Sequence, residues 1–180
     1  MTHRLLFAGF GGQGIMLMGE LLAYAAMIDG KQVTYMPSYG PEMRGGTANC
    51  SVIVSDGPIA SPIITEAGIL IAMNEPSLDK FEDDVDPEGL VFINRSLIGR
   101  KPRRSDVVSV AVDCIELARD ILNEKIANIV MLGAVIRKSN IVSPDSVGEA
   151  LRRKFSGKKE AFIPINESAL SAWRERSEEH

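Results

Sequence analysis

The chain has 180 residues, 45% of them apolar, and a formal net charge of -4 from 20 basic and 24 acidic side chains. That length and apolar content predict one domain over residues 1–180, and the negative charge argues against nucleic acid as a partner. Cys50 and Cys114 lie too far apart for a usual zinc or iron–sulfur spacing, so we expect no metal site. Scarce cysteines, no leader-like segment and no membrane-length apolar run predict a cytoplasmic protein that does not enter a membrane.

The first part of the chain alternates between strand and helix patterns. An apolar run at residues 5–8 predicts a strand, the glycine-rich residues 9–14 a turn, and the periodicity of residues 15–28 a helix. A second strand is expected at residues 32–36. An irregular loop follows it, and strand character resumes at residues 47–54.

The rest of the chain continues this alternation. Continuous apolar runs at 68–73 and 89–93 are typical of parallel strands covered on both faces, and residues 107–112 predict another strand. Helices are expected at 114–122, 127–138 and from the Ser143 N-cap to about residue 155, with a last helical segment broken near Pro164. The order predicts an α/β fold: a single Rossmann-like, doubly wound, mostly parallel sheet with helices on both faces.

The turn after the first strand has the G-x-G-x-x-G spacing at Gly9, Gly11 and Gly14. Such a turn can bring a phosphate to a helix N-terminus, but a dinucleotide site also needs an acidic residue at the end of the second strand. That strand ends in Thr-Tyr-Met-Pro, and Asp29 precedes it. The turn can therefore be structural, bind NAD or FAD, or contact a partner subunit or its ligand, with Gln13 donating a hydrogen bond into the site.

The irregular loop at residues 38–46 combines a carboxylate, an arginine, hydroxyl groups and three glycines. It is predicted to leave one parallel strand and enter another, which would place it beside the glycine turn at the carboxyl edge of the sheet. Asn74 and Asn94 each end an apolar strand and would face the same crevice, or serve as turn or helix-cap residues. The candidate cofactor-binding or inter-subunit residues are Gly9, Gly11, Gly12, Gln13, Gly14, Ser38, Tyr39, Gly40, Glu42, Arg44, Gly45, Gly46, Asn74 and Asn94.

The motifs at residues 9–14 and 37–50, with those at 55–56, 74–81 and 94–96, resemble the gamma subunits of 2-oxoacid:ferredoxin oxidoreductases. The Ser-Tyr-Gly-Pro-Glu-Met-Arg-Gly-Gly segment is most similar to the 2-oxoglutarate branch. The resemblance implies a complex of alpha, beta, gamma and delta subunits that decarboxylates a 2-oxo acid on thiamine diphosphate with magnesium. It also implies transfer of the acyl group to coenzyme A, and of electrons through iron–sulfur clusters to ferredoxin.

The residues themselves agree with a chain that is not active alone. The two histidines, His3 and His180, lie at the termini, and no thiamine diphosphate signature is present, so we assign no catalytic residue and no cofactor to this chain by itself. Arg44 is the best candidate for binding a carboxylate or phosphate. The basic stretches at 100–104 and 152–159 could meet coenzyme A phosphates or an acidic neighbour, although a solvated surface explains them better. Two alternatives remain: a free-standing NAD-dependent Rossmann-type oxidoreductase, and a non-catalytic ligand-binding or assembly module.

Overall fold

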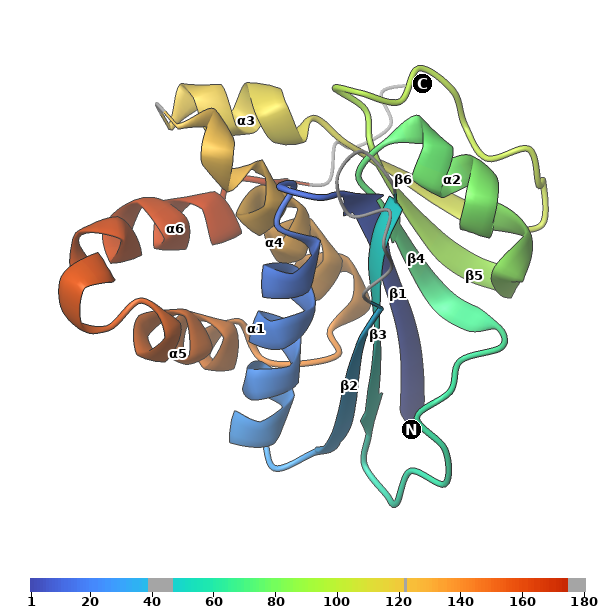
Figure 1. Ribbon diagram of the computed structural model, residues 1–180, viewed down its shortest axis with the longest axis horizontal. Helices are drawn as coiled ribbons and strands as arrows, with labels where there is room; N and C mark the ends of the chain where they lie inside the picture. The colour runs from blue at the N-terminus through green and yellow to red at the C-terminus, as the bar shows by residue number, and fades with distance from the viewer. Residues whose placement is uncertain (39–46, 122, 175–180) are drawn as a thin grey trace.

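The computed structural model describes residues 1–38, 47–121 and 123–174 (Figure 1). Its sheet has six strands in the order β2-β3-β1-β4-β5-β6. The strands are β1 (Thr2–Phe10), β2 (Gln32–Ser38), β3 (Thr47–Ser55), β4 (Ala67–Ala72), β5 (Val85–Asn94) and β6 (Val108–Val112). The helices are α1 (Ile15–Ile28), α2 (Glu75–Phe81), α3 (Cys114–Asp120), α4 (Ala127–Ser139), α5 (Pro144–Lys154) and α6 (Ile163–Leu170), with short 3-10 turns at Glu82–Asp84, Glu124–Ile126 and Gly157–Phe162.

The predicted α/β class and mostly parallel sheet are confirmed, with one correction. Strands β1, β4, β5 and β6 run parallel, whereas β3 is antiparallel to both β1 and β2. The loop at 38–46 therefore joins two antiparallel neighbours and does not link parallel strands. Short connections favour antiparallel pairs, because a parallel crossover needs a dozen or more residues. A second difference is α2, a helix that the sequence analysis did not predict.

The two faces of the sheet carry unequal layers of helix. Along β1, Leu5 and Phe7 enter the larger hydrophobic cluster with α1, α3, α4 and α5, while Leu6 enters a smaller cluster with α2. Figure 1 shows α1 and α4 beside the sheet, with α5 and α6 further out, and α2 at its other side. Since α1 follows β1 and α2 follows β4, the chain leaves these adjacent strands toward opposite faces. This is a topological switch point, where α/β sheets open a crevice at the strands' carboxyl ends.

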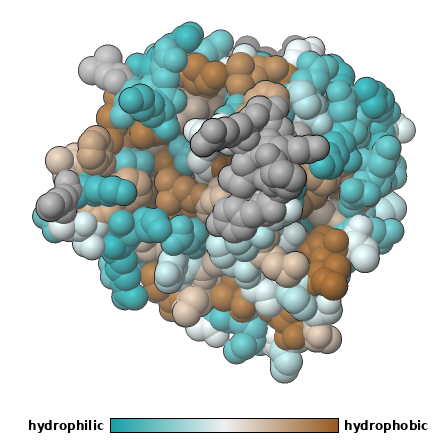
Figure 2. Space-filling model, viewed as in Figure 1, coloured by the Kyte–Doolittle hydropathy of each residue, from teal (hydrophilic) through white to brown (hydrophobic). Residues whose placement is uncertain are grey.

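The surface in the view of Figure 1 alternates between polar and apolar areas. Apolar side chains lie there in separate patches among hydrophilic ones (Figure 2). Among the described residues, no helix combines the length and the apolar character needed to cross a membrane.

The buried carboxylate of Glu82 binds the basic stretch at residues 100–104, which lies between β5 and β6. Glu82 is only 1% exposed, and its oxygens accept from the Arg100 guanidinium at 3.0 Å and from the Arg103 backbone N–H at 2.9 Å. Asp79 also pairs with Arg100, and Arg104 pairs with Asp106. The three arginines of this stretch are thus already paired with carboxylates of the same chain and are not free to bind an anion.

The same contacts govern the protonation of Glu82. Burial by itself raises the pKa of this carboxyl, but the hydrogen bonds from Arg100 and Arg103 outweigh burial and hold the pKa below its ordinary value. A depressed folded-state pKa contributes stability that is complete above the unfolded pKa and is lost as the pH falls through the folded value.

We expect Glu82→Gln to lower the free energy of unfolding at neutral pH by about 3 kcal/mol, because it leaves two buried arginine contacts without a charge. Urea denaturation measures this change. Repeated at acidic pH, the difference between the variant and the wild type should shrink as wild-type Glu82 becomes protonated. Asp83→Asn, an exposed carboxylate in the same turn, is the control and should change stability by less than about 0.5 kcal/mol. A difference that stays constant with pH would contradict this account.

Candidate functional site

Three side-chain amides meet at the carboxyl edge of the sheet around the ends of β1, β4 and β5. The Gln13 Oε1 atom accepts from the Phe10 backbone N–H at 2.7 Å and from Asn74 Nδ2 at 2.9 Å. Gln13 Nε2 and Asn94 Nδ2 both donate to the Met73 carbonyl oxygen, each at 3.3 Å. We call Gln13, Asn74 and Asn94 the amide cluster. It holds the glycine turn against the ends of the two neighbouring parallel strands.

Two members of the amide cluster have further roles. Asn74 is the N-cap of α2 and accepts from the Ser77 backbone N–H at 2.9 Å, so the predicted capping role is observed for a side chain that also contacts the glycine turn. Asn94 is 1% exposed, and its Oδ1 accepts no hydrogen bond from a described protein group. Buried carbonyl oxygens are normally satisfied, so this atom is one that a water or ligand donor would complete.

Backbone geometry explains two of the glycines. A Cβ on Gly9 would lie 2.5 Å from Ile15 Cδ1 and 2.8 Å from Gln13 Oε1, so a side chain there would displace the amide cluster. Gly14 has a left-handed φ of 73° at the N-cap of α1, and a Cβ there would lie 2.2 Å from Asn128 Nδ2. Only glycine satisfies both requirements at position 14 without strain.

Asn128 in α4 is a residue that sequence reasoning missed. Its side chain is buried and donates to the Gly14 carbonyl oxygen at 3.4 Å, so α4 is hydrogen-bonded to the glycine turn. The two residues are 114 positions apart, and nothing in the local sequence of α4 distinguishes Asn128 from an ordinary polar residue near a helix start.

The start of α1 is suited to an anion. No side chain caps it, and its first turn contains no acidic residue. The first N–H groups of a helix lack partners within the helix and carry the positive end of its dipole. A phosphate or carboxylate can therefore bind at this end of the helix.

The structure places some of the other predicted residues and leaves several outside the described ranges. Gly11 and Gly12 are exposed in the turn, and Ser38 is exposed at the end of β2. The end of β2 and the start of β3 lie at the same edge as the glycine turn, because Phe10 pairs with Thr47 and Ser38 pairs with Asn49. The remaining candidates lie outside the described residues: Tyr39, Gly40, Glu42, Arg44, Gly45 and Gly46. Whether any of the candidates touches a ligand or partner stays a prediction.

Neither the two cysteines nor His3 supplies a nucleophile or a base at this edge. Burial raises the pKa of Cys50 to about 12 and shifts the pKa of Cys114 upward as well, so both thiols are neutral at physiological pH. Burial lowers the pKa of His3, which lies at the opposite end of β1. Within the described ranges, no three His, Cys, Asp or Glu side chains are grouped to hold a metal ion.

Asp29, the acidic residue considered for a ribose, has a structural partner instead. Its carboxylate accepts from the Ser143 backbone N–H at 2.7 Å, from Ser143 Oγ at 3.1 Å and from Ser146 Oγ. Burial raises the pKa of Asp29, but the hydrogen bonds from Ser146 and Ser143 lower it overall. Asp29 thus fastens the start of α5 to the end of α1 and is not available at the end of β2.

The family model described as pyruvate ferredoxin/flavodoxin oxidoreductase matches residues 4–175. The chain belongs to this family. It is 38% identical over 154 residues to "2-oxoglutarate synthase subunit KorC" of Methanocaldococcus jannaschii, with 84% of this chain and 82% of the relative covered. It is 36% identical over 178 residues to "Ketoisovalerate oxidoreductase subunit VorA" of Methanothermobacter thermautotrophicus, covering 98% of this chain. The chain spans only 37% of that VorA relative.

A solved structure agrees with these relatives. The gamma subunit of a keto/oxoacid ferredoxin oxidoreductase from Geobacter sulfurreducens PCA has a TM-score of 0.83 and is 32% identical, with 94% of this chain and 95% of that chain covered. The resemblance found in the sequence motifs is confirmed by the family match and by this likeness. The fold expected from it is confirmed as well.

We expect Gly14→Ala to destabilise the fold more than Gly30→Ala. Gly30 also has a left-handed φ, of 75°, but nothing lies within 4 Å of its added Cβ, so that substitution measures the backbone cost alone, about 1–2 kcal/mol. Gly14→Ala adds the collision with Asn128, about 1–3 kcal/mol more. Thermal and urea unfolding of both variants give the comparison. Equal losses would show that Asn128 does not confine the glycine turn.

Proposed function

We propose that this chain is the gamma subunit of a multi-subunit 2-oxoacid:ferredoxin oxidoreductase that converts a 2-oxo acid to an acyl-coenzyme A and passes electrons to ferredoxin. The observation that carries the proposal is the family match over residues 4–175. The two described thiols are buried and protonated, and His3 lies at the opposite end of β1, so these groups supply no nucleophile or base at the amide cluster. Alpha, beta and delta subunits are the expected partners. We expect the complex to work in the cytoplasm.

We propose 2-oxoglutarate as the 2-oxo acid. The Ser-Tyr-Gly-Pro-Glu-Met-Arg-Gly-Gly segment supports this choice, as does the similarity to a relative named as a 2-oxoglutarate synthase subunit over most of both chains. The comparable identity to a ketoisovalerate oxidoreductase subunit makes branched 2-oxo acids the substrates to test beside it.

The contribution of this chain is binding and positioning at the glycine turn. The uncapped start of α1 can hold a phosphate of coenzyme A, and the amide cluster keeps the turn in place for it. Thiamine diphosphate with magnesium supplies the decarboxylation chemistry when bound, and we assign it and the iron–sulfur clusters to the other subunits. Asn94 Oδ1 and Ser38 at the end of β2 are the further groups of this chain at that edge.

The free-standing NAD-dependent enzyme is disfavoured by the position of Asp29. A ribose needs a carboxylate at the end of the second strand, and this carboxylate is held by two serines at the start of α5. The family match also favours the subunit over that alternative.

The proposal predicts that the isolated chain oxidises no 2-oxo acid and that it purifies with the other subunits when isolated from its native cell. Assays of that complex with 2-oxoglutarate, pyruvate and 2-oxoisovalerate, each with coenzyme A and ferredoxin, test the reaction and its preference. Calorimetric titration of the chain should show affinity for coenzyme A and none for NAD. Saturable NAD binding that Gly11→Leu abolishes would instead support the free-standing enzyme.

We predict that Arg44→Ala leaves folding intact but weakens assembly or acyl transfer in the reconstituted complex by tenfold or more, the loss of about one charge-assisted contact. Size-exclusion chromatography measures assembly, and acyl-coenzyme A formation measures transfer. Arg153→Ala is the control, because this exposed arginine pairs with Glu149 on the same helix. Unchanged assembly and turnover in Arg44→Ala would remove Arg44 from the site.

A further inference from the structure

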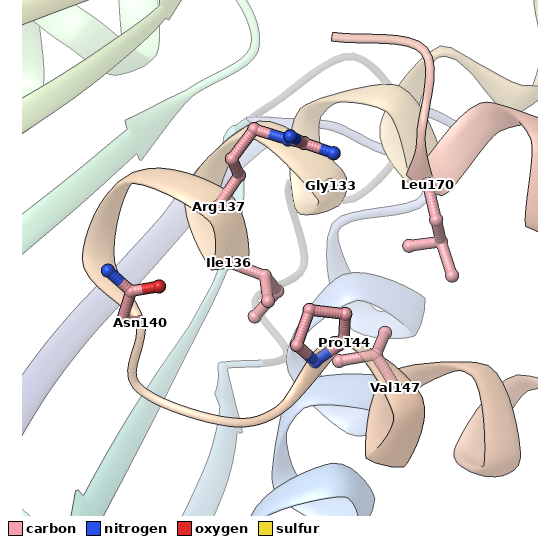
Figure 3. A pocket seen from close by; sticks show the side chains of 7 residues that line it. All are labelled: Gly133, Ile136, Arg137, Asn140, Pro144, Val147 and Leu170. Carbon is pink, nitrogen blue, oxygen red and sulfur yellow. The ribbon is translucent and has the colours of Figure 1, made fainter. Parts of the chain in front are cut away.

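A cavity of about 250 Å³ lies between α4, α5 and α6 and shares no residue with the amide cluster. Figure 3 shows its aliphatic walls, with Ile136 of α4 directed toward Pro144 and Val147 of α5, and Leu170 of α6 closing the side. Gly133 lets α6 approach closely at one end, where an added Cβ would lie 2.2 Å from the Leu170 carbonyl oxygen. The helices separate beyond this contact and leave the hollow.

Two polar side chains line the cavity, Arg137 near the end of α4 and Asn140 at its C-cap. Arg137 is exposed and makes no hydrogen bond or ion pair with any described residue. Each of the other arginines in residues 1–38, 47–121 and 123–174 donates at least one hydrogen bond. Arg137 is therefore the one arginine of these ranges whose guanidinium donors have no partner among the described residues.

Three carboxylates near the cavity, those of Asp29, Glu149 and Glu167, have partners of their own. The Asp29 carboxylate accepts from the Ser143 backbone N–H, and the Ser143 side chain accepts from the Ser146 N–H. These N–H groups at the start of α5 are therefore not open to an anion. Glu167 of α6 pairs with Arg152 at 2.5 Å, and Glu149 of α5 pairs with Arg153 at 2.8 Å. An anion entering the cavity would therefore meet Arg137 without competition from these three side chains.

We propose that this cavity is a binding site for a short aliphatic monocarboxylate. The apolar tail lies among Ile136, Pro144, Val147 and Leu170, and the carboxylate takes two parallel hydrogen bonds from Arg137, the geometry in which a guanidinium binds carboxylates best. At about 30 Å³ for a water-sized group, the volume suits on the order of eight non-hydrogen atoms. A branched carboxylate of about six carbons has that size, and an apolar pocket with a few polar groups is the usual form of such sites.

Binding would couple the three helices, because the ligand touches each of them. A molecule that binds the folded state alone raises its stability in proportion to occupancy. The thermal midpoint of the full chain should therefore rise with ligand concentration.

The test is titration of the full chain with 4-methylpentanoate and with its neutral isostere 4-methylpentanamide, followed by calorimetry and by NMR shifts of the Val147 and Leu170 methyl groups. We expect saturable binding of the acid, with affinity at least tenfold weaker for the amide. Arg137→Gln should lose the same factor for the acid, since it removes the charge from an exposed side chain without affecting the core.

Arg153→Gln, a charge removed from the exposed side of α5, is the matched control and should bind the acid as the wild type does. Three results would overturn the proposal. These are no saturable binding of the acid, equal binding of acid and amide, or binding that Arg137→Gln leaves unchanged.

Discussion

The hydrogen bonds received by the Met73 carbonyl oxygen hold the carboxyl edge of the sheet together. Gln13 reaches this oxygen from the turn after β1, and Asn94 reaches it from the end of β5, while the Met73 N–H donates to Ala8 of β1 at 2.9 Å. One peptide at the end of β4 thus fixes three strand ends relative to one another. The bond from Asn74 to Gln13 and the bond from Asn128 to Gly14 add to this attachment of the glycine turn.

The contacts that join these strand ends come from neutral amide side chains. Amides donate and accept hydrogen bonds but do not titrate, and the two thiols are buried with raised pKa values. The amide cluster therefore holds the strand ends together through groups that carry no charge.

Local patterns in the sequence were enough to predict most elements and the glycine turn. The glycine turn joins β1 to α1 as expected, although Gly9 and Phe10 still belong to β1, and the Ser143 and Pro144 pair begins α5. The antiparallel direction of β3 was not predicted. The sequence pattern of an apolar strand is the same for both directions, and its direction is decided by the strands with which it pairs. Asn128 could not be found for a related reason, since its role exists only when α4 packs beneath Gly14.

At the site, too, roles that depend on neighbouring residues in the sequence could be predicted, and contacts between distant residues could not. Asn74 could be recognised as the residue after an apolar strand and before a helix, which is a local signal for both of its roles. The pairing of Arg100 with Glu82 joins residues from two separate connections, so the charges of residues 100–104 looked free in the sequence. The position of Asp29 before β2 did predict correctly that it would not reach the end of that strand.

The attachment of α5 to α1 bears on the order in which the chain can fold. Asp29 contacts Ser143 and Ser146 across more than 110 residues, and Lys154 pairs with Glu20 at 2.5 Å across 134. Helix α1 is therefore synthesised long before the helix that covers its outer side. During synthesis its apolar side remains uncovered until most of the chain has left the ribosome, and such surfaces are where aggregation begins and chaperones bind. Completion of this domain is consequently a late event that depends on contacts distant in sequence, which slow folding.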